Sequence, residues 1–459
     1  MTKKFDAIII GTGQAGPSMA QRMTREGMKT AIIERKLFGG TCVNVGCIPT
    51  KALVASARAA HMARRGGDFG VTIDGPITVD MKQVKARKDA IVKQSSDGVT
   101  NWLKSMENLT VYEGHGRLES ANTVSVNGEM LEADKIVLNV GGRATVPDMP
   151  GINDVDYLTN TGMMDVDVLP EHLVIIGGSY IGLEFAQMYR RFGSRVTVVE
   201  MAPKLIGRED DDVSTTVHEI LTQDGIDIRL NASCIGLAKR DGQVVVTADC
   251  EPGAEDIVGS HVLLAVGRKP NTDDLGLDAA GVETDARGYI AVDDGLQTNV
   301  PGIWAIGDVN GRGAFTHTAY NDYEILAANM FDNDPRKVSD RITTYGLFID
   351  PPLGRVGMTE AQVRESGRKA LVGKMMMARV GRARERSETQ GFMKILIDAE
   401  TDRILGGTIL GIGGDEAIHA LIDIMYADAP YTVIQRAVPI HPTVSELIPT
   451  MLGDLKPLE

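Results

Sequence analysis

Two cysteines, Cys42 and Cys47, are the residues of this sequence best suited to redox chemistry. They stand in the stretch Gly39-Gly-Thr-Cys-Val-Asn-Val-Gly-Cys-Ile-Pro-Thr-Lys51. With this spacing, one helical turn or an entry loop brings the sulfurs close enough for a disulfide. A zinc site would need two further ligands at matched spacing, and Cys234 and Cys250 are distant and isolated. Two inert buried thiols are the alternative, which the glycine-rich setting disfavours.

The sequence contains two copies of one unit, which consists of a strand, a glycine loop, a helix, a second strand and an acidic residue. These units must position the cysteines. The first unit contains residues 5–10, Gly11, Gly13, Gly16, residues 30–33 and Glu34. The second contains residues 173–176, Gly177, Ser179, Gly182, residues 195–199 and Glu200. This order is the fingerprint of a dinucleotide-binding βαβ unit. Two complete units predict two nucleotide cofactors, with the cysteines directly after the first unit.

Each part of such a unit has a physical role. The first glycine permits a tight turn, the second lets the backbone approach a pyrophosphate, and the third lets helix and strand pack closely. The helix N-terminus offers N–H donors and a positive dipole to phosphate. In the second unit Ser179 replaces the middle glycine. Glu200 favours NADH over NADPH, because a 2′-phosphate would meet its carboxylate, although Arg208 lies further along the same loop.

Composition and charge exclude several classes of protein. At 459 residues the chain is long enough for about two to four domains. A formal charge of −14 disfavours binding to nucleic acid or to an anionic membrane, and no segment is apolar enough to span a bilayer. Four cysteines in a chain of this length are not a disulfide scaffold, so we expect a cytoplasmic enzyme.

The stretch 39–51 resembles the redox-active disulfide of the class I pyridine nucleotide–disulfide oxidoreductases. That family includes dihydrolipoamide dehydrogenase, glutathione reductase, mercuric reductase and the reactive-chlorine resistance reductases. Both glycine loops, Gly307-Asp308 and the segment His441-Pro-Thr-Val-Ser-Glu446 extend the resemblance over the whole chain. It implies an α/β fold with two Rossmann-like domains, for FAD and NAD, and an α+β C-terminal dimerisation domain. The expected divisions are 1–150 and 273–344 for FAD binding, 151–272 for NAD(P) binding and 345–459 for dimerisation.

The resemblance also implies roles for single residues. Cys47 would face the flavin, Cys42 would face the substrate, and Lys51 would pair with Glu184 beside the flavin. Tyr180 would be a lid that moves when nicotinamide enters. The FAD contacts implied are Gly11, Gly13, Gly16, Glu34, Gly40, Thr41, Lys51, Gly116, Gly142, Gly307, Asp308 and Ala319. The NAD contacts implied are Gly177, Ser179, Tyr180, Gly182, Glu184, Glu200 and Gly267.

His441 and Glu446 form a further expected pair. A carboxylate can orient an imidazole and raise its basicity, which gives an acid/base able to move a thiol proton. In the family, this pair reaches the disulfide of the other subunit. The resemblance therefore implies a homodimer with a shared active site.

The electron acceptor is the least determined part of the function. The C-terminal cysteine pair of mercuric reductase is missing, and Glu200 argues against the NADPH that glutathione reductase uses. Segments 315–323, 348–360 and 382–391 are most similar to the reactive-chlorine resistance reductases. We therefore expect an NADH-dependent reductase acting on a thiophilic metal such as Cu(II) or Hg(II), or on an oxidised species, with no resident metal. Dihydrolipoamide dehydrogenase is one alternative, and a flavin NAD(P)H oxidase or transhydrogenase is another.

Overall fold

The computed structural model describes residues 2–249 and 255–459, and its first large sheet is parallel. The strand order is β18-β8-β2-β3-β4. The bounds are Ala7–Ile10 for β2, Thr30–Glu34 for β3, Leu109–Glu113 for β4, Lys135–Leu138 for β8 and Ile303–Ala305 for β18. The central strands are short runs of Ile, Val and Ala that are buried on both faces, as parallel strands require when helices cover the sheet.

A second parallel sheet repeats this design. Its order is β12-β11-β10-β16, with β10 at His172–Ile176, β11 at Arg195–Val199, β12 at Asp227–Arg229 and β16 at His261–Leu264. The helices α6 (Tyr180–Phe192) and α7 (Asp211–Gln223) belong to it. The pairing of β10 with β11 places Ile176 beside Val199, so Gly177 and Glu200 leave neighbouring strands at the same edge.

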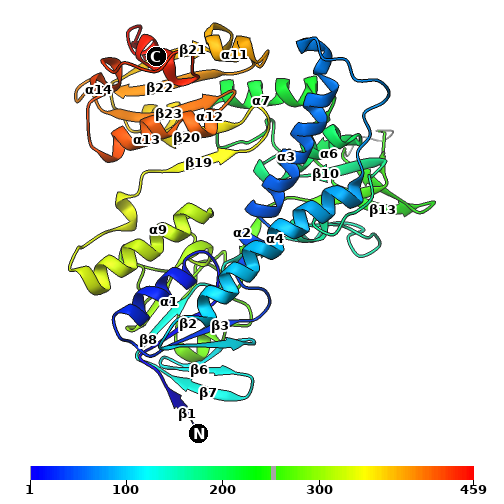
Figure 1. Ribbon diagram of the computed structural model, residues 1–459. Coiled ribbons are helices and arrows are strands. Elements are labelled where there is room, and N and C mark those ends of the chain that lie inside the picture. Colours follow the sequence, from blue (N-terminus) through cyan, green and yellow to red (C-terminus); the bar gives the residue numbers. More distant parts are fainter. Residues whose placement is uncertain (1, 250–254) are drawn as a thin grey trace.

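The third large sheet is built by the C-terminal part of the chain. Its order is β19-β20-β23-β22-β21-β24, and all its pairings are antiparallel. The bounds are Thr344–Leu347, Leu353–Gly357, Ala370–Met376, Phe392–Asp398, Ile404–Leu410 and Lys456–Pro457 for β19 to β24. This sheet and its helices form the part drawn in yellow to red at the top of Figure 1, at the opposite end from the first sheet.

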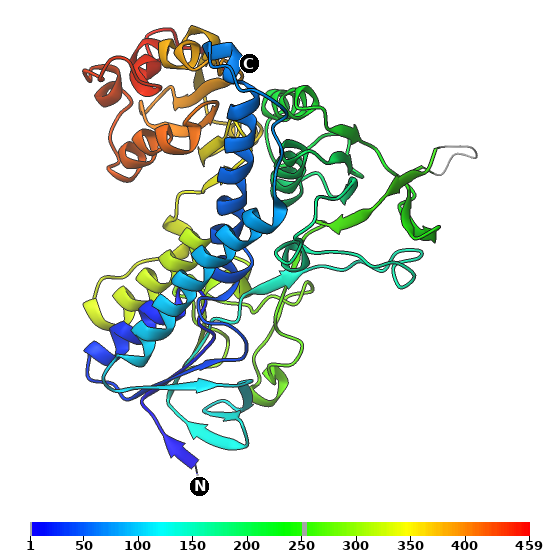
Figure 2. The ribbon, with the colours of Figure 1, turned by 45° about the vertical axis from the view of Figure 1, so that its right-hand side comes forward.

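Two long helices run through the middle of the molecule and join these parts. The helix α3 (Cys47–Arg64) packs against α4 (Met81–Lys104) and against α6. Figures 1 and 2 both show α3 rising from the first sheet towards the C-terminal part. The N-terminus of α4 is fixed by Asp80, whose carboxylate accepts hydrogen bonds from the N–H groups of Lys82 and Gln83. Cys47 is the first residue of α3, so this helix positions it.

Short elements complete the fold. The remaining helices are α1 (Gly16–Arg25), α2 (Gly40–Asn44), α5 (Asn160–Met163), α8 (Leu277–Ala280), α9 (Thr316–Ala327), α10 (Glu360–Glu365), α11 (Gly381–Glu385), α12 (Gly414–Ala417), α13 (His419–Tyr426), α14 (Thr432–Gln435) and α15 (Ile448–Met451). The small sheets contain β1 (Thr2–Lys4), β5 (Arg117–Ser120), β6 (Thr123–Val126) and β7 (Glu129–Glu132), and β13 (Gly236–Arg240), β14 (Gln243–Thr247) and β15 (Ile257–Gly259). Within the described residues, no helix is long and apolar enough to cross a membrane.

Two chain segments connect the part with the first parallel sheet to the part with the second, and they run side by side. The strand β9 (Gly142–Ala144) leaves the first part and pairs antiparallel with β17 (Arg268–Pro270), which returns to it. After the return, β18 joins the edge of the first sheet beside β8. The α/β class with two parallel sheets and a separate C-terminal sheet is confirmed, whereas the domain boundaries given above stay predictions.

Candidate active site

The first glycine loop connects β2 to α1. Gly11 has a φ of +105°, and a Cβ on it would lie 2.3 Å from the carbonyl oxygen of Asn139. A Cβ on Gly16 would lie 2.3 Å from the carbonyl oxygen of Gly11. The Glu34 carboxylate accepts hydrogen bonds from the backbone N–H of Thr12 at 3.0 Å and from its hydroxyl at 2.6 Å. The loop is therefore a tight turn whose backbone conformation and close contacts only glycine permits at these positions.

The second glycine loop has the same construction. Gly177 has a φ of +114°, and a Cβ on Gly182 would lie 2.1 Å from the Gly177 carbonyl oxygen. The Glu200 carboxylate accepts a 2.6 Å hydrogen bond from the N–H of Gly178. Ser179 is exposed and directly precedes α6 in an extended conformation, so its side chain replaces the second glycine without strain.

Both glycine loops line one cavity of about 2010 Å³. Most of the residues expected at a cofactor or in catalysis line it: Gly11, Gly13, Glu34, Gly40, Thr41, Cys42, Cys47, Lys51, Gly116, Gly142, Gly177, Ser179, Tyr180, Glu184, Glu200, Gly267, Gly307, Asp308 and Ala319. Gly16 and Gly182 do not line it, because they pack behind the loops against Gly11 and Gly177. Their role is to let each helix approach its strand.

The cavity fits two dinucleotides by shape and chemistry. A Cβ on Gly40 would lie 2.9 Å from Cα of Gly13, so the cysteine segment closes directly onto the first loop. The helices α1 and α6 begin at the two loops and offer N–H groups to phosphate. The carboxylates of Glu34 and Glu200 stand at the ends of β3 and β11, where a ribose diol can reach them.

The two cysteines lie on adjacent helices at this cavity. Cys42 is in α2 and Cys47 begins α3, and both are free thiols. Sγ of Cys47 lies 3.3 Å from Oγ1 of Thr316. A hydrogen bond from Cys42, with smaller contributions from the Thr316 hydroxyl and the Lys51 charge, lowers the pKa of Cys47 to about 6. The same hydrogen bond, with burial, raises the pKa of Cys42. The pair is therefore asymmetric, with the thiolate on Cys47.

A charged pair stands beside the cysteines. The ammonium of Lys51 lies 2.7 Å from the carboxylate of Glu184, which is 5% exposed. The other carboxylate oxygen accepts a 3.1 Å hydrogen bond from the N–H of Phe348. The Phe348 ring lies under the ammonium, with its centroid 4.4 Å from Nζ. Lys51 is thus held at a fixed place by a residue of α6 and by the segment after β19.

Sequence reasoning missed Asn139, which braces the first loop. Its side-chain amide donates to the carbonyl oxygens of Gly11 and Gly13, at 3.2 Å each. The signal was a polar residue directly after the apolar strand β8, at the carboxyl edge of a parallel sheet. On the same side of the cavity, burial raises the pKa of Asp308, and Arg268 opposes this shift from 4.0 Å.

His441 and Glu446 lie apart from the cavity of their own chain. Nδ1 of His441 lies 2.7 Å from the Glu446 carboxylate, and the histidine side chain is 82% exposed while that of Glu446 is 10% exposed. Neither residue is among those of the described chain that line the cavity. The imidazole is therefore oriented but faces outward from this protomer.

The expectation that Cys234 is isolated is wrong. Cys234 is disulfide-bonded, and it lines the cavity. Spacing in the sequence did not reveal this, because the distance and direction that a disulfide requires of two cysteines are set by the fold. Cys250 lies outside the described residues.

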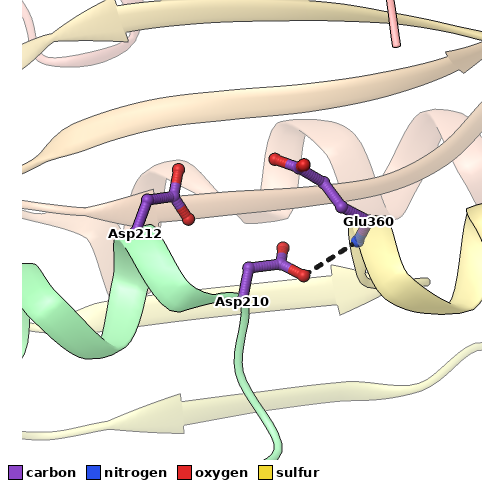
Figure 3. Close-up of side chains that lie close together, drawn as sticks. All are labelled: Asp210, Asp212 and Glu360. Atoms are coloured by element: carbon purple, nitrogen blue, oxygen red, sulfur yellow. Dashed lines mark hydrogen bonds between the residues drawn. The ribbon is translucent and has the colours of Figure 1, made fainter. Parts of the chain in front are cut away.

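A group of three carboxylates, from Asp210, Asp212 and Glu360, lies where the start of α7 meets α10 of the C-terminal part (Figure 3). The ammonium of Lys394, which is 2% exposed, lies 2.6 to 3.1 Å from all three. Lys394 thus supplies the positive charge at the place where a cation would otherwise neutralise these groups. We interpret the cluster as an ion-pair network that joins these two parts of the molecule.

Comparison with known proteins identifies the class to which this fold and site belong. Residues 5–322 match the family described as pyridine nucleotide-disulphide oxidoreductase, and residues 343–452 match its dimerisation domain. The chain belongs to this family and is an FAD-dependent disulfide oxidoreductase. Membership implies FAD and a pyridine nucleotide as cofactors, and the dimerisation domain supports a homodimer.

Individual relatives narrow the class further. The chain is 35% identical to the probable pyridine nucleotide-disulfide oxidoreductase RclA of Escherichia coli, over 99% of this chain and 100% of that protein. It is 33% identical to the dihydrolipoyl dehydrogenase of Haloferax volcanii, over 96% of this chain and 94% of that protein. The structure of the Cu(II) complex of the HOCl-induced flavoprotein disulfide reductase RclA matches with a TM-score of 0.89 at 34% identity, over 97% of this chain and 99% of that one.

Proposed function

We propose that this protein is an NADH-dependent reductase that passes electron pairs through Cys42 and Cys47 to a thiophilic metal ion such as Cu(II) or Hg(II), or to an oxidised species. The observation that carries the proposal is the unequal pair of thiols beside Lys51 and Glu184, at a cavity lined by two nucleotide loops. When bound, FAD would accept hydride from NADH and deliver two electrons to the disulfide. Lys51 provides a fixed positive charge where negative charge develops.

The two thiols then have different tasks. The low pKa of Cys47 keeps it as a thiolate facing the cavity, where Thr316 and Lys51 stabilise its charge. The protonated Cys42 is the thiol that meets the acceptor. With Cu(II) as acceptor, each of two ions takes one electron and becomes Cu(I), the disulfide re-forms, and the single proton of Cys42 leaves. With a disulfide acceptor, thiol exchange at Cys42 transfers the same two electrons.

His441 would serve Cys42 of the other subunit in a homodimer. It is exposed on its own chain, and Glu446 orients its Nδ1, so Nε2 is free to exchange a thiol proton. An exposed catalytic imidazole that stands apart from the nucleotide cavity of its own chain is expected when the site is completed by a partner. The shared active site, the roles of the individual site residues and a cytoplasmic location are parts of this proposal.

NADH is the proposed nicotinamide cofactor. Both oxygens of the Glu200 carboxylate accept backbone hydrogen bonds, from Gly178 at 2.6 Å and from Ala202 at 2.8 Å. This fixed negative charge lies where the 2′-phosphate of NADPH would be placed and therefore favours an unsubstituted ribose. Arg208 also lines the cavity and is a cation that would weaken this preference.

Lipoamide is the second candidate acceptor. It is favoured by the similarity to dihydrolipoyl dehydrogenases, several of which are more than 30% identical over nearly the whole chain. The metal ion is preferred because the chain is 35% identical to RclA, against 33% to the dihydrolipoyl dehydrogenase of Haloferax volcanii, and one solved structure of RclA is a Cu(II) complex.

Two measurements test the proposal. Anaerobic addition of NADH to the FAD-loaded enzyme should give a long-wavelength absorption band from the Cys47 thiolate beside the flavin. Direct bleaching of the flavin without that band would exclude the disulfide mechanism and favour an oxidase or transhydrogenase. A turnover panel with Cu(II), Hg(II), lipoamide, oxidised glutathione and oxygen then identifies the acceptor, and fast turnover of lipoamide alone would replace the metal proposal.

A further inference from the structure

Glu209 is a buried carboxylate that the proposed reaction does not use. It is 2% exposed and belongs to the segment between β11 and α7. Its Oε1 accepts hydrogen bonds from two phenols, that of Tyr180 at 3.4 Å and that of Tyr345 at a shorter distance. Both phenols line the cavity, so one carboxylate ties together two aromatic residues of the site.

The two phenols belong to different parts of the molecule. Tyr180 is the first residue of α6, at the second glycine loop, whereas Tyr345 is in β19. Their rings meet edge to face, with centroids 5.5 Å apart. Tyr345 also stacks on Phe315, with centroids 5.8 Å apart. The ring of Tyr180 therefore packs against Tyr345 and, through it, Phe315, which belong neither to α6 nor to the second sheet.

Arg355 is the positively charged residue next to the other carboxylate oxygen of Glu209. Nη1 of Arg355 lies 3.6 Å from Oε2 of Glu209, and Arg355 is 1% exposed. Within the described chain, this Oε2 and two nitrogens of Arg355 have no hydrogen-bond partner. A buried carboxylate with such sparse compensation is costly, so its remaining oxygen is a strong acceptor. In this structure that oxygen is close to the Tyr345 hydroxyl and at the longer distance of 3.4 Å from the Tyr180 hydroxyl. Asp210 continues the connection, because it contacts both Arg355 and the Lys394 network.

We propose that Glu209 is a positioning residue that holds the Tyr180 lid closed over the nicotinamide site, and that Tyr345 competes with Tyr180 for the same oxygen. This inference rests on the proposed function, in which Tyr180 moves when nicotinamide enters. Opening the lid then requires the Tyr180 hydroxyl to leave Glu209, which adds to the cost of binding NADH. Without the Tyr345 hydroxyl, Tyr180 is the only phenol that donates to Oε1 of Glu209. The hydrogen bond between Tyr180 and Glu209 then becomes stronger, and the lid is harder to open.

The two variants should consequently change NADH binding in opposite directions. Glu209→Gln replaces a charge-assisted bond by a neutral one and should lower the NADH concentration for half-maximal reduction rate about fivefold. Tyr345→Phe keeps the ring and should raise that concentration about threefold. The limiting rate of reduction should stay within about twofold in both, since neither residue touches the cysteines.

Stopped-flow reduction of the FAD-loaded enzyme by NADH is the experiment, with Tyr180→Phe as the background that removes the lid bond. In Tyr180→Phe enzyme, Glu209→Gln should not change the NADH concentration for half-maximal reduction rate, because the hydroxyl through which Glu209 acts is absent. Equal effects in both backgrounds, or a Tyr345→Phe effect in the same direction as Glu209→Gln, would overturn the proposal. Asp211→Asn, an exposed acid two positions further on at the start of α7, is the matched control and should change nothing.

The experiment separates this inference from the function itself. If wild-type enzyme is not reduced by NADH at all, the proposed function fails. If it is reduced normally and Glu209→Gln has unchanged half-saturation, only the lid proposal fails. If Glu209→Gln does not fold because Arg355 loses its counter-charge, Tyr345→Phe alone still decides the sign of the effect.

Discussion

Sγ of Cys47 lies 3.3 Å from Oγ1 of Thr316, although 269 positions separate the two residues in the chain. Cys47 begins α3 and Thr316 begins α9, so the contact joins the first nucleotide unit to the segment that returns to it. A hydroxyl that donates to the thiolate makes its charge less costly. This contact gives the pair part of its unequal acidity.

The ionisation of Cys47 should be visible in the reduced enzyme. Its pKa is lowered to about 6, so the thiolate is present above that pH and is lost as the pH falls through it. The long-wavelength band of the NADH-reduced enzyme should therefore disappear with a midpoint near pH 6. Thr316→Val should raise the midpoint by about one unit, because a donor to the charged form is lost. An unchanged midpoint would exclude the hydroxyl as donor.

The Lys51–Glu184 pair should shift the same titration in opposite directions. The Lys51 charge lowers the pKa of Cys47 and the Glu184 charge raises it. Lys51→Met should consequently move the midpoint to higher pH, and Glu184→Gln should move it to lower pH. Lys51→Met should also cost about 2 kcal/mol of unfolding free energy, less than the loss of a fully buried pair because the Lys51 side chain is 34% exposed. Shifts of equal sign would contradict this account.

The third glycine of each unit should not accept a methyl group. A Cβ on Gly16 or Gly182 would lie 2.3 or 2.1 Å from a backbone oxygen, which forces helix and strand apart. Gly16→Ala should yield protein with little bound FAD, measured by the absorbance ratio of flavin to protein. Gly182→Ala should retain FAD and raise the KM for NADH about tenfold or more. Gly98→Ala, in α4 with open space around it, should bind both normally.

The selectivity for nicotinamide should follow Glu200. Wild-type enzyme should have a kcat/KM for NADH about tenfold or more above that for NADPH, because a phosphate would meet the carboxylate. Glu200→Ser should reduce the preference mainly by improving NADPH. Arg208→Ala tests the opposing cation and should leave NADH kinetics unaltered while weakening NADPH. A wild-type preference for NADPH would contradict the assignment.

Mixed dimers should reveal whether the active site is shared. Neither Cys42→Ser nor His441→Ala enzyme should turn over an acceptor at a normal rate. If His441 serves the partner's Cys42, a dimer with one chain of each variant has one intact site. Random reassociation of equal amounts should then restore about a quarter of wild-type activity. Recovery of nothing, while size-exclusion and tag pull-down show mixed dimers, would place both residues in one chain.

The two nucleotide-binding units and the redox-active cysteine pair could be identified from the sequence alone. Glycines 11, 16, 177 and 182 are required by turns whose geometry depends on residues a few positions apart, so the spacing alone identifies them. The α/β class followed from the same local patterns. The resemblance added Lys51 and Glu184, which the structure places in contact.

The distant residues that complete the site could not be predicted from the sequence, because the three-dimensional fold brings them together. The contacts of Thr316 with Cys47, of Asn139 with the first loop and of Glu209 with Tyr345 depend on how distant segments of the chain pack against one another. Such contacts are fixed by packing between segments more than a hundred residues apart, and no local spacing records them.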